Sequence, residues 1–259
     1  MSIQTAIIAC GGNGTRMYPI TKSIPKEMLP IGTIPVIDYI LFDCYSAGIE
    51  NIVFVINQNK TQLIDYIYKT KEEDFKKNMR FSFIPQIKNY GTACLLQSVR
   101  HVVDDEFFAL LFPDEVFLSK ETSMQQLLAA YERTQEQTVG VFCTDRYSFR
   151  DYGIVDYNKN TNLLTDIIEK PTENPPSLYA VCGRFIFSES IYRYLDALYP
   201  TNGEFYLTDA IRIACKAETY SVQPLSGKRY DCGSRENYLR FIHEIHSSGI
   251  DIFQNRNTK

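Results

Sequence analysis

A loop rich in glycine and positive charge follows the first apolar segment of the chain, over residues 9–31. The residues of this loop that could bind a ligand are Gly11, Gly12, Gly14, Arg16 and Lys26. Glycines leave room for successive backbone N–H groups to face an anion. A guanidinium can fork onto two phosphate oxygens, and an ammonium supplies compact positive charge. The combination therefore predicts a polyphosphate site.

Two common phosphate fingerprints do not fit this loop. The P-loop requires a Lys-Ser or Lys-Thr pair soon after its glycines, and the dinucleotide fingerprint requires an acidic residue that closes the next strand. An ordinary surface turn with solvated cations is the simplest alternative for a lone glycine-rich loop. Here G-G-N-G-T-R instead continues into P-I-T-K-S-I-P-K-E-M-L-P, so the whole string needs an explanation.

This string resembles the signature of the sugar-1-phosphate nucleotidyltransferases, and P-K-E-M-L-P is most similar to their bacterial uridylyl branch. The resemblance implies an enzyme that transfers a uridylyl group from UTP to glucose 1-phosphate, giving UDP-glucose and pyrophosphate with Mg²⁺. It places the nucleotide at Ala9, Gly11, Gly12, Gly14, Thr15, Arg16 and Lys26.

A second segment of the nucleotide site is implied at Gln86 to Gly91. In the resembling family, a Gln followed five positions later by a Gly reads the edge of the pyrimidine base. Uridylyl enzymes more often carry a longer glycine-rich segment here, and the compact loop is similar to that of the thymidylyl branch. UTP and dTTP therefore both stay open. Without the resemblance, an ordinary strand-to-helix turn with a solvated Gln86 is the simpler interpretation.

Two acidic residues far apart in the chain resemble the metal-binding carboxylates of the family. Asp114 follows an apolar run over 107–112, and Asp231 lies in the string D-C-G that ends at Gly233. On this resemblance both acids hold Mg²⁺, which prefers oxygen ligands and completes its shell with phosphate and water. Glu115 stands where an Asp is more usual, and its role stays open. Asp114 alone would equally suit a turn cap.

Three further strings, Y-G-I-V, E-K-P and V-C-G-R-F, resemble the sugar-contacting motifs of the family in the expected order. The sugar-phosphate residues that they imply are Tyr152, Gly153, Glu169, Lys170 and Val181. Each string alone is a weak signal, and their order and spacing carry the inference. A later string, E-F-Y-L-T-D-A-I, predicts a helix with Thr208 or its neighbour as the N-cap and Ile211 on the buried face.

The resemblance assigns catalysis to a set of cations and acids: Arg16, Lys26, Asp114, Lys170 and Asp231. A phosphate monoester is already an anionic nucleophile near neutral pH, so the reaction requires orientation and charge neutralisation more than a general base. Alternatives that stay open are another sugar 1-phosphate and, in a different class, a catalytically silent homologue that binds nucleotide sugars. The intact set of charged residues argues against the silent homologue.

Alternating periodicities indicate the elements that must position these residues. Apolar runs predict strands over 5–9, 51–57, 80–86, 107–112 and 138–144, and amphipathic spacing predicts helices over 35–48, 60–69, 92–101 and 124–133. Extended runs over 152–156, 163–169 and 178–188 follow. We predict an α/β fold with a Rossmann-like, mostly parallel mixed sheet flanked by helices, and a small β-rich sugar-binding lobe.

The length of 259 residues suits a single nucleotidyltransferase domain over 1–259. We expect a nucleotide-binding part over about 1–145, a sugar-binding part over about 146–233 and a C-terminal helix over 234–250. The acids and bases that alternate over 71–77 predict a solvated helix face. The relatives that the string resembles suggest a homo-oligomer, a dimer or a tetramer.

Composition excludes several other classes of protein. A net charge of −4 argues against a nucleic-acid surface, and no apolar run approaches the ~20 residues that cross a bilayer. The N-terminus has no signal-peptide pattern. Seven cysteines without a C-x-x-C pair predict reduced, packed thiols in a cytoplasmic protein, although Cys10 and Cys232 flank glycines of the candidate site. Three histidines without a Cys-His cluster give no zinc pattern.

Overall fold

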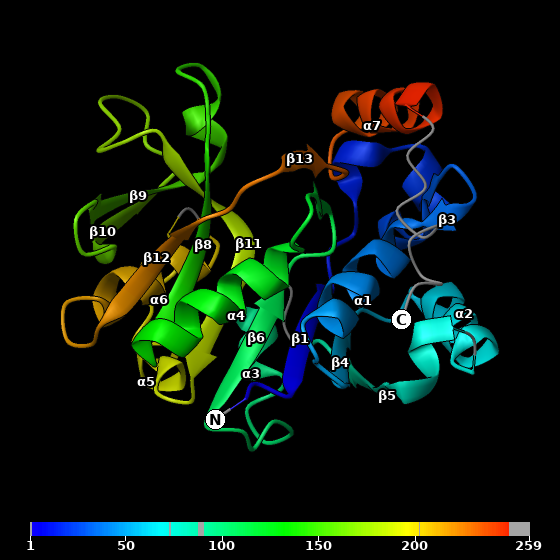
Figure 1. Ribbon diagram of the computed structural model, residues 1–259, viewed down its shortest axis with the longest axis horizontal. Coiled ribbons are helices and arrows are strands. Elements are labelled where there is room, and N and C mark those ends of the chain that lie inside the picture. Colours follow the sequence, from blue (N-terminus) through cyan, green and yellow to red (C-terminus); the bar gives the residue numbers. More distant parts are fainter. Residues whose placement is uncertain (1, 73, 88–90, 202, 249–259) are drawn as a thin grey trace.

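The computed structural model describes residues 2–72, 74–87, 91–201 and 203–248. Within them, one nine-stranded sheet runs through the molecule (Figure 1). From edge to edge, its strands are β5 (Arg80–Pro85), β4 (Asn51–Ile56), β1 (Thr5–Cys10), β6 (Phe107–Leu111), β11 (Tyr179–Ser188), β8 (Gln137–Cys143), β12 (Tyr220–Pro224), β10 (Leu163–Glu169) and β9 (Gly153–Asn158).

Helices cover both faces of this sheet (Figure 1). They are α1 (Val36–Ser46), α2 (Thr61–Thr70), α3 (Cys94–Gln97), α4 (Ser123–Thr134), α5 (Ile191–Asp196), α6 (Leu207–Ala214) and α7 (Arg235–Ser248). Short 3₁₀ helices are η1 (Thr15–Met17), η2 (Ile20–Lys22), η3 (Lys26–Met28), η4 (Asp74–Asn78) and η5 (Ser148–Asp151). The end of the C-terminal helix predicted over 234–250 lies outside the described residues. None of the described helices has the length and apolar character to cross a membrane.

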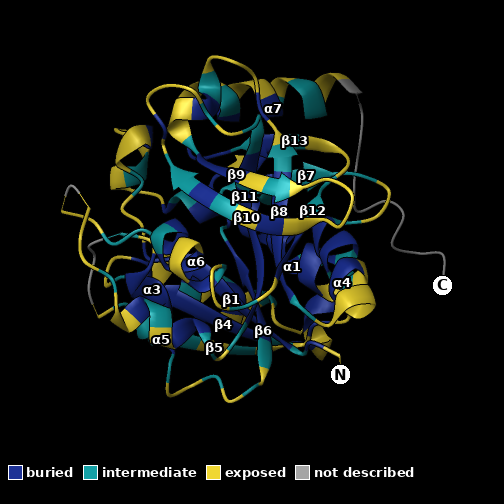
Figure 2. Ribbon diagram, turned by 90° about the vertical axis from the view of Figure 1, so that its left-hand side faces the viewer, coloured by how far each residue is buried: buried dark blue, intermediate teal, exposed yellow. Residues whose placement is uncertain are grey.

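The first half of the sheet is parallel, because β5, β4, β1 and β6 are each joined by a crossover. Side chains alternate between the two faces of a strand, so Ile8 of β1 packs in one apolar cluster and Ile7 in the other. Figure 2 shows β1, β4 and β6 largely buried, whereas the residues of the edge strand β5 are exposed or half-buried. Their carboxyl ends meet at one edge, where open α/β sheets bind ligands.

The second half of the sheet is mixed. Strand β11 lies antiparallel between β6 and β8, β12 is parallel to β8, and β9 and β10 form an antiparallel hairpin. The predicted sugar-side strands therefore extend the same sheet that carries the glycine loop. The predicted α/β fold with a mixed sheet and flanking helices is confirmed, while the boundary between the two functional parts stays a prediction.

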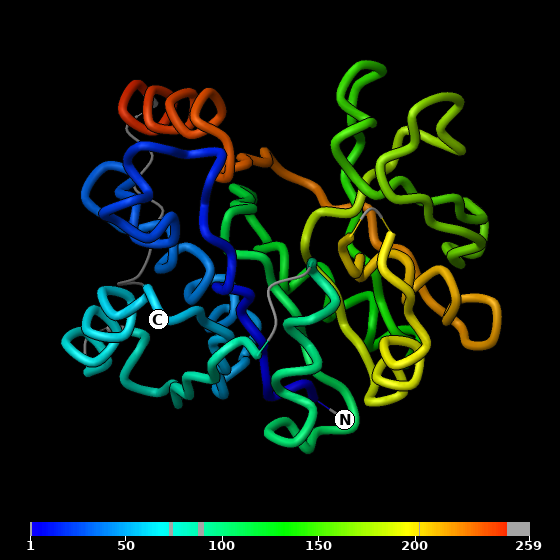
Figure 3. The backbone as a smooth tube through the Cα atoms, turned by 180° about the vertical axis from the view of Figure 1, so that it is seen from behind, coloured from blue at the N-terminus to red at the C-terminus, as the bar shows by residue number. Residues whose placement is uncertain are grey.

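Two small antiparallel ribbons lie outside the main sheet. The first pairs β7 (Glu115–Leu118) with β13 (Lys228–Asp231), and the second pairs β2 (Pro30–Ile31) with β3 (Ile34–Pro35). Seen from behind, α7 lies beside the early segment of the chain (Figure 3), and Tyr238 Oη donates to the carbonyl oxygen of Pro30 at 2.8 Å. The C-terminal helix thereby packs against the segment that follows the glycine loop.

Two local expectations differ from the structure. The helix predicted over 92–101 is only α3, because the start of the segment bonds elsewhere: Ala93 N donates to Phe205 O at 3.0 Å and Thr92 Oγ1 accepts from Leu207 N at 3.0 Å. Thr208 is not an N-cap. Tyr206 occupies that position of α6, whereas Ile211 is buried as predicted.

The charge run over 71–77 is not wholly solvated. Lys76 is 4% exposed and forms an ion pair with Asp38 of α1 at 2.9 Å. Its ammonium group also donates to Tyr66 Oη at 3.3 Å and Thr70 Oγ1 at 3.1 Å. These acceptors come from α1 and α2, so the local alternation of charge could not reveal that this lysine would be buried.

Candidate active site

The glycine loop begins at the carboxyl end of β1 and faces the end of β5. A Cβ atom added to Gly11 would lie 1.5 Å from Gln86 Oε1, so the Gln86 side chain covers this glycine directly. Asn57 Nδ2 donates to Gly11 O at 2.9 Å and holds the loop against β4. Gly14 adopts the left-handed conformation, with φ of 64°, as the N-cap of η1. The structure thus brings together the two segments predicted to bind the nucleotide.

Gly91 lies where only a glycine fits. Its φ is 109°, and an added Cβ would lie 2.4 Å from the carbonyl oxygen of Phe205. Residues 88–90 of the predicted base loop lie outside the described residues. The close contact with the Phe205 backbone already explains why a glycine is required at this position. A role of Gly91 in reading the base therefore stays a prediction.

Two cations and two acids from distant segments converge around Gly233. Lys26 Nζ forms an ion pair with Asp114 Oδ2 at 2.6 Å, and Arg16 Nη2 lies 3.9 Å from the same oxygen. A Cβ added to Gly233 would lie 2.7 Å from Arg16 Nη2, 2.7 Å from Asp114 Oδ2 and 2.9 Å from Asp231 Oδ1. Four of the five residues predicted to be catalytic therefore face one small space, which the missing side chain of Gly233 leaves open.

Burial and charge set the protonation states of the Lys26–Asp114 ion pair. Burial alone would raise the pKa of Asp114, but the Lys26 ammonium outweighs it and holds the pKa below its usual value. Burial alone would lower the pKa of Lys26, yet Asp114 raises it above its usual value. Both groups are therefore charged at neutral pH. Arg16 differs from them, because 68% of its side chain is exposed and available to an incoming anion.

The geometry fits a divalent cation that takes only part of its ligand shell from the protein. Among the described residues, no group of three or more His, Cys, Asp or Glu side chains could enclose a metal. Asp114 and Asp231 offer two carboxylate oxygens directed at the space beside Gly233. Mg²⁺ commonly uses one or two carboxylates together with substrate phosphates and water. The two carboxylates therefore suit a divalent cation that takes its remaining ligands from substrate and water.

The five predicted sugar-side residues also lie together. A Cβ on Gly153 would lie 3.1 Å from Glu169 Oε2 and 3.3 Å from Val181 Cγ2. Lys170 N donates to Tyr152 O at 3.0 Å. The predicted set therefore surrounds the start of β9.

Lys170 has an uncommon backbone conformation within this group. Its φ is 43°, in the left-handed region that non-glycine residues rarely adopt and that clusters at functional sites. Its ammonium lies 3.5 Å from Glu169 Oε1 and 5.1 Å from the centre of the Tyr206 ring. Burial raises the pKa of Glu169, against the lowering effects of Lys170 and of Thr208, whose hydroxyl donates to Glu169 Oε2 at 2.8 Å.

Sequence reasoning left the role of Glu115 open and gave none to Arg229. The two side chains form a buried fork, in which Arg229 Nε donates to Oε2 and Nη2 donates to Oε1 at 2.7 Å. Burial raises the pKa of Glu115, against the lowering effect of Arg229. Alternation within β13 was an available signal, since Arg229 lies two positions before Asp231 and therefore on the same side of the strand.

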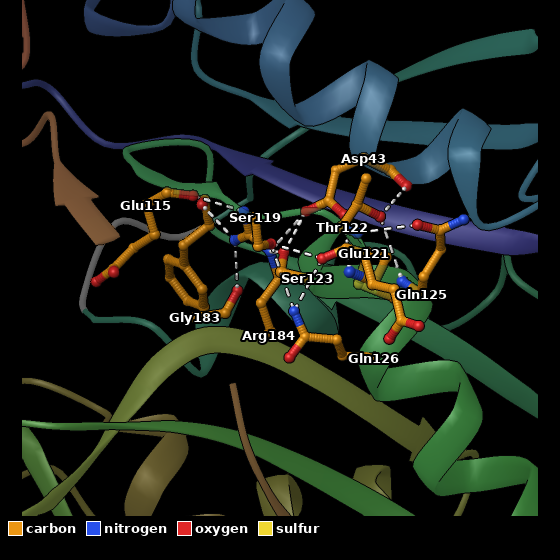
Figure 4. A network of polar contacts seen from close by, with 12 residues as sticks. Asp43, Glu115, Ser119, Glu121, Thr122, Ser123, Gln125, Gln126, Gly183 and Arg184 are labelled. Carbon is orange, nitrogen blue, oxygen red and sulfur yellow. Dashed lines mark hydrogen bonds and ion pairs between the residues drawn. The ribbon is translucent and has the colours of Figure 1, made fainter. Parts of the chain in front are cut away.

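Arg184, part of a predicted sugar motif, is fully buried and packs against the loop that carries Asp114 (Figure 4). Its guanidinium donates to the carbonyl oxygens of Phe112 at 3.1 Å and Glu115 at 2.5 Å, on either side of Asp114. It also donates to Ser123 Oγ at 3.0 Å and lies 3.4 Å from Asp43 Oδ2. Arg184 is therefore a structural residue of the loop and has no access to a sugar.

The cysteines nearest the site are not reactive nucleophiles. Burial raises the pKa of the Cys10 and Cys232 thiols, so both stay neutral. The expectation of packed thiols is wrong for Cys143, which is exposed.

Replacing Gly233 by alanine is expected to lower turnover by about tenfold or more, a loss of roughly 1.4 kcal/mol of transition-state stabilisation. The φ of Gly233 lies outside the left-handed region, so alanine is tolerated by the backbone, but its methyl group would displace Asp114 and Asp231. Steady-state pyrophosphate release measures the effect. Circular dichroism and thermal unfolding of the Gly233→Ala variant control for general damage to the fold. Unchanged turnover in a folded Gly233→Ala variant would contradict the expectation.

Comparison with known proteins agrees with this geometry. The family model described as nucleotidyl transferase matches residues 5–248. The UTP–glucose-1-phosphate uridylyltransferase of Mycoplasma genitalium is 32% identical, over 92% of this chain and 90% of that protein.

Solved structures extend the comparison. A UDP-glucose pyrophosphorylase complexed with UDP-glucose superposes with a TM-score of 0.89 at 30% identity, over 95% of this chain and 99% of that one. A UTP-bound enzyme from Acinetobacter baumannii gives 0.80 at 25% identity, over 93% of both chains. Because the family model matches nearly the whole chain, this protein belongs to the nucleotidyl transferase family.

Proposed function

We propose that this chain transfers the uridylyl group of UTP to glucose 1-phosphate, giving UDP-glucose and pyrophosphate with Mg²⁺ as cofactor. The convergence of Arg16, Lys26, Asp114 and Asp231 around Gly233 carries the proposal, because it combines cations for a triphosphate with carboxylates for a metal. The activity in the names of the relatives supports the choice of UTP and glucose 1-phosphate.

The reaction forms one bond and breaks another at the α-phosphorus of UTP. An anionic oxygen of glucose 1-phosphate attacks this atom, and the bond to the bridging oxygen breaks on the opposite side, so pyrophosphate leaves. The glycine loop and Arg16 bind the triphosphate, and Lys26 faces the charge that develops on the leaving group. Lys170 holds the sugar phosphate, with Glu169 placed for the sugar hydroxyls. Mg²⁺ bound by Asp114 and Asp231 would supply positive charge beside the α-phosphate.

The proposal is tested by measuring pyrophosphate release with Mg²⁺, glucose 1-phosphate and each of UTP, dTTP, CTP, ATP and GTP in turn. We expect release with UTP well above that with the other nucleotides. Preference for dTTP would replace the uridylyl assignment by a thymidylyl one. Absence of release with every pair, while nucleotide still binds, would favour another sugar 1-phosphate or a silent homologue.

A further inference from the structure

Arg229 lies between the two acid-bearing segments and the sugar-side strands. Its guanidinium forks onto Glu115, and only 13% of the Arg229 side chain and 14% of the Glu115 side chain is exposed. The same guanidinium lies 3.9 Å from the centre of the Phe142 ring and 4.9 Å from that of Tyr152. Its Nη1 reaches Tyr152 Oη at 3.4 Å. One side chain therefore joins β7 and β13 to β8 and the start of β9.

The ribbon of β7 and β13 carries both candidate metal carboxylates at one end. Asp231 pairs with Glu115 in the antiparallel register, and Asp114 directly precedes Glu115. The pairing continues beyond the ribbon, because Cys232 N donates to Asp114 O at 2.7 Å. A shift of the Glu115 side chain would therefore be transmitted to the backbone of both acids.

Charge gives a second reason for the fork. Asp114, Asp231 and Glu115 are close enough to interact electrostatically. The Arg229 guanidinium neutralises the negative charge of Glu115. Like charges at short range repel, and burial strengthens the repulsion because the local dielectric is low. Loss of Arg229 would leave Glu115 as an uncompensated carboxylate beside the candidate metal site.

We propose that Arg229 is a positioning residue that, through Glu115 and Tyr152, holds the two metal carboxylates and the sugar-facing side chain in one arrangement. The inference rests on the proposed function, since it takes Tyr152 as part of the sugar site. Sugar binding thereby depends on a guanidinium that contacts the carboxylate of Glu115 and two aromatic rings. Glu115 acts with Arg229 as one unit, which gives a role to the residue that differs from the usual family pattern.

The test compares ligands with and without the sugar, by calorimetric titration without Mg²⁺, so that a displaced metal carboxylate contributes to neither affinity. In Arg229→Gln, we expect the affinity for UDP-glucose to fall by about tenfold, the scale of losing a charged hydrogen-bonded pair. The affinity for UMP should change less than about twofold, because the glycine loop is untouched. The KM for glucose 1-phosphate should rise together with the loss of UDP-glucose affinity.

Arg212→Gln is the matched control. Arg212 forks onto Asp166 at 2.9 Å and 3.1 Å, and this pair lies on the more exposed contact of β10 with α6. We expect wild-type affinity for UDP-glucose in this variant. The double variant Glu115→Gln/Arg229→Gln should lose no more affinity than Arg229→Gln alone, because residues that act as a unit are not additive.

Two results would overturn the proposal. One is a folded Arg229→Gln variant with wild-type affinity for UDP-glucose, and the other is an equal loss of UMP and UDP-glucose affinity. If Arg229→Gln does not fold by circular dichroism, Arg229→Lys keeps the charge without the fork, and the same criteria apply to it. Failure of wild-type pyrophosphate release would refute the proposed function separately, since the titrations measure Arg229 without turnover.

Discussion

Replacing Lys26 by alanine is expected to lower the turnover number by on the order of 10²-fold or more, comparable to the loss of an oxyanion-hole donor. Lys26 Nζ lies 2.6 Å from Asp114 Oδ2 and only 13% of its side chain is exposed. Removal therefore has two effects in a low-dielectric site. It removes a positive charge from the space proposed for the leaving pyrophosphate, and it leaves Asp114 buried without its main counter-charge, so the pKa of Asp114 should rise.

A structural role alone would not produce this loss of turnover, and a second buried lysine provides the comparison. Lys76 pairs with Asp38 at 2.9 Å and its side chain is 5% exposed, but its partners come from α1 and α2 and not from the residues around Gly233. Lys76→Ala should destabilise the fold by about 3–5 kcal/mol, the cost of breaking a buried pair, with turnover retained at a temperature where the protein is folded. Pyrophosphate release and thermal unfolding measure the two properties. Lys26→Ala with wild-type turnover would remove Lys26 from the proposed mechanism.

Local pattern was sufficient for the parallel half of the fold. The strand predicted over 5–9 is β1, and the strand predicted over 107–112 is β6, because continuous apolar runs are typical of strands that are covered on both faces. The glycine loop and Asp114 follow such strands directly, so the edge at which they meet could be inferred. The resemblance placed Asp231 beside them, although no local signal does so.

Contacts between segments far apart in the chain could not be predicted from local sequence patterns. Strand β11 has an ordinary strand pattern, and nothing in it indicates that it would lie antiparallel between β6 and β8. The ribbon of β7 with β13 joins residues more than a hundred positions apart, and it determines the partner of Glu115. The short α3 has the same cause, because bonds to the segment around Phe205 compete with helical ones.

Arg184 shows how such long-range contacts support the site, and its removal is expected to cost about 3–5 kcal/mol in the free energy of unfolding. The side chain is fully buried, and it binds two carbonyl oxygens of the Asp114 loop as well as Ser123 and the carboxylate of Asp43. Arg184→Met keeps much of the volume but leaves Asp43 without its positive partner. Urea unfolding measures the change, and wild-type stability would contradict the expectation.

The source of that cost can be separated with a second variant. Asp43 also accepts a hydrogen bond from Met124 N at 2.7 Å, which an asparagine oxygen can replace. Arg184→Met/Asp43→Asn should therefore be more stable than Arg184→Met alone, because no uncompensated buried charge remains. Turnover should stay low in both variants, since the carbonyl oxygens of Phe112 and Glu115 still lack their donor. A double variant as unstable as the single one would show that the cost comes from the lost hydrogen bonds of Arg184 and not from the uncompensated charge of Asp43. Restored turnover would show that the Asp114 loop keeps its shape without Arg184.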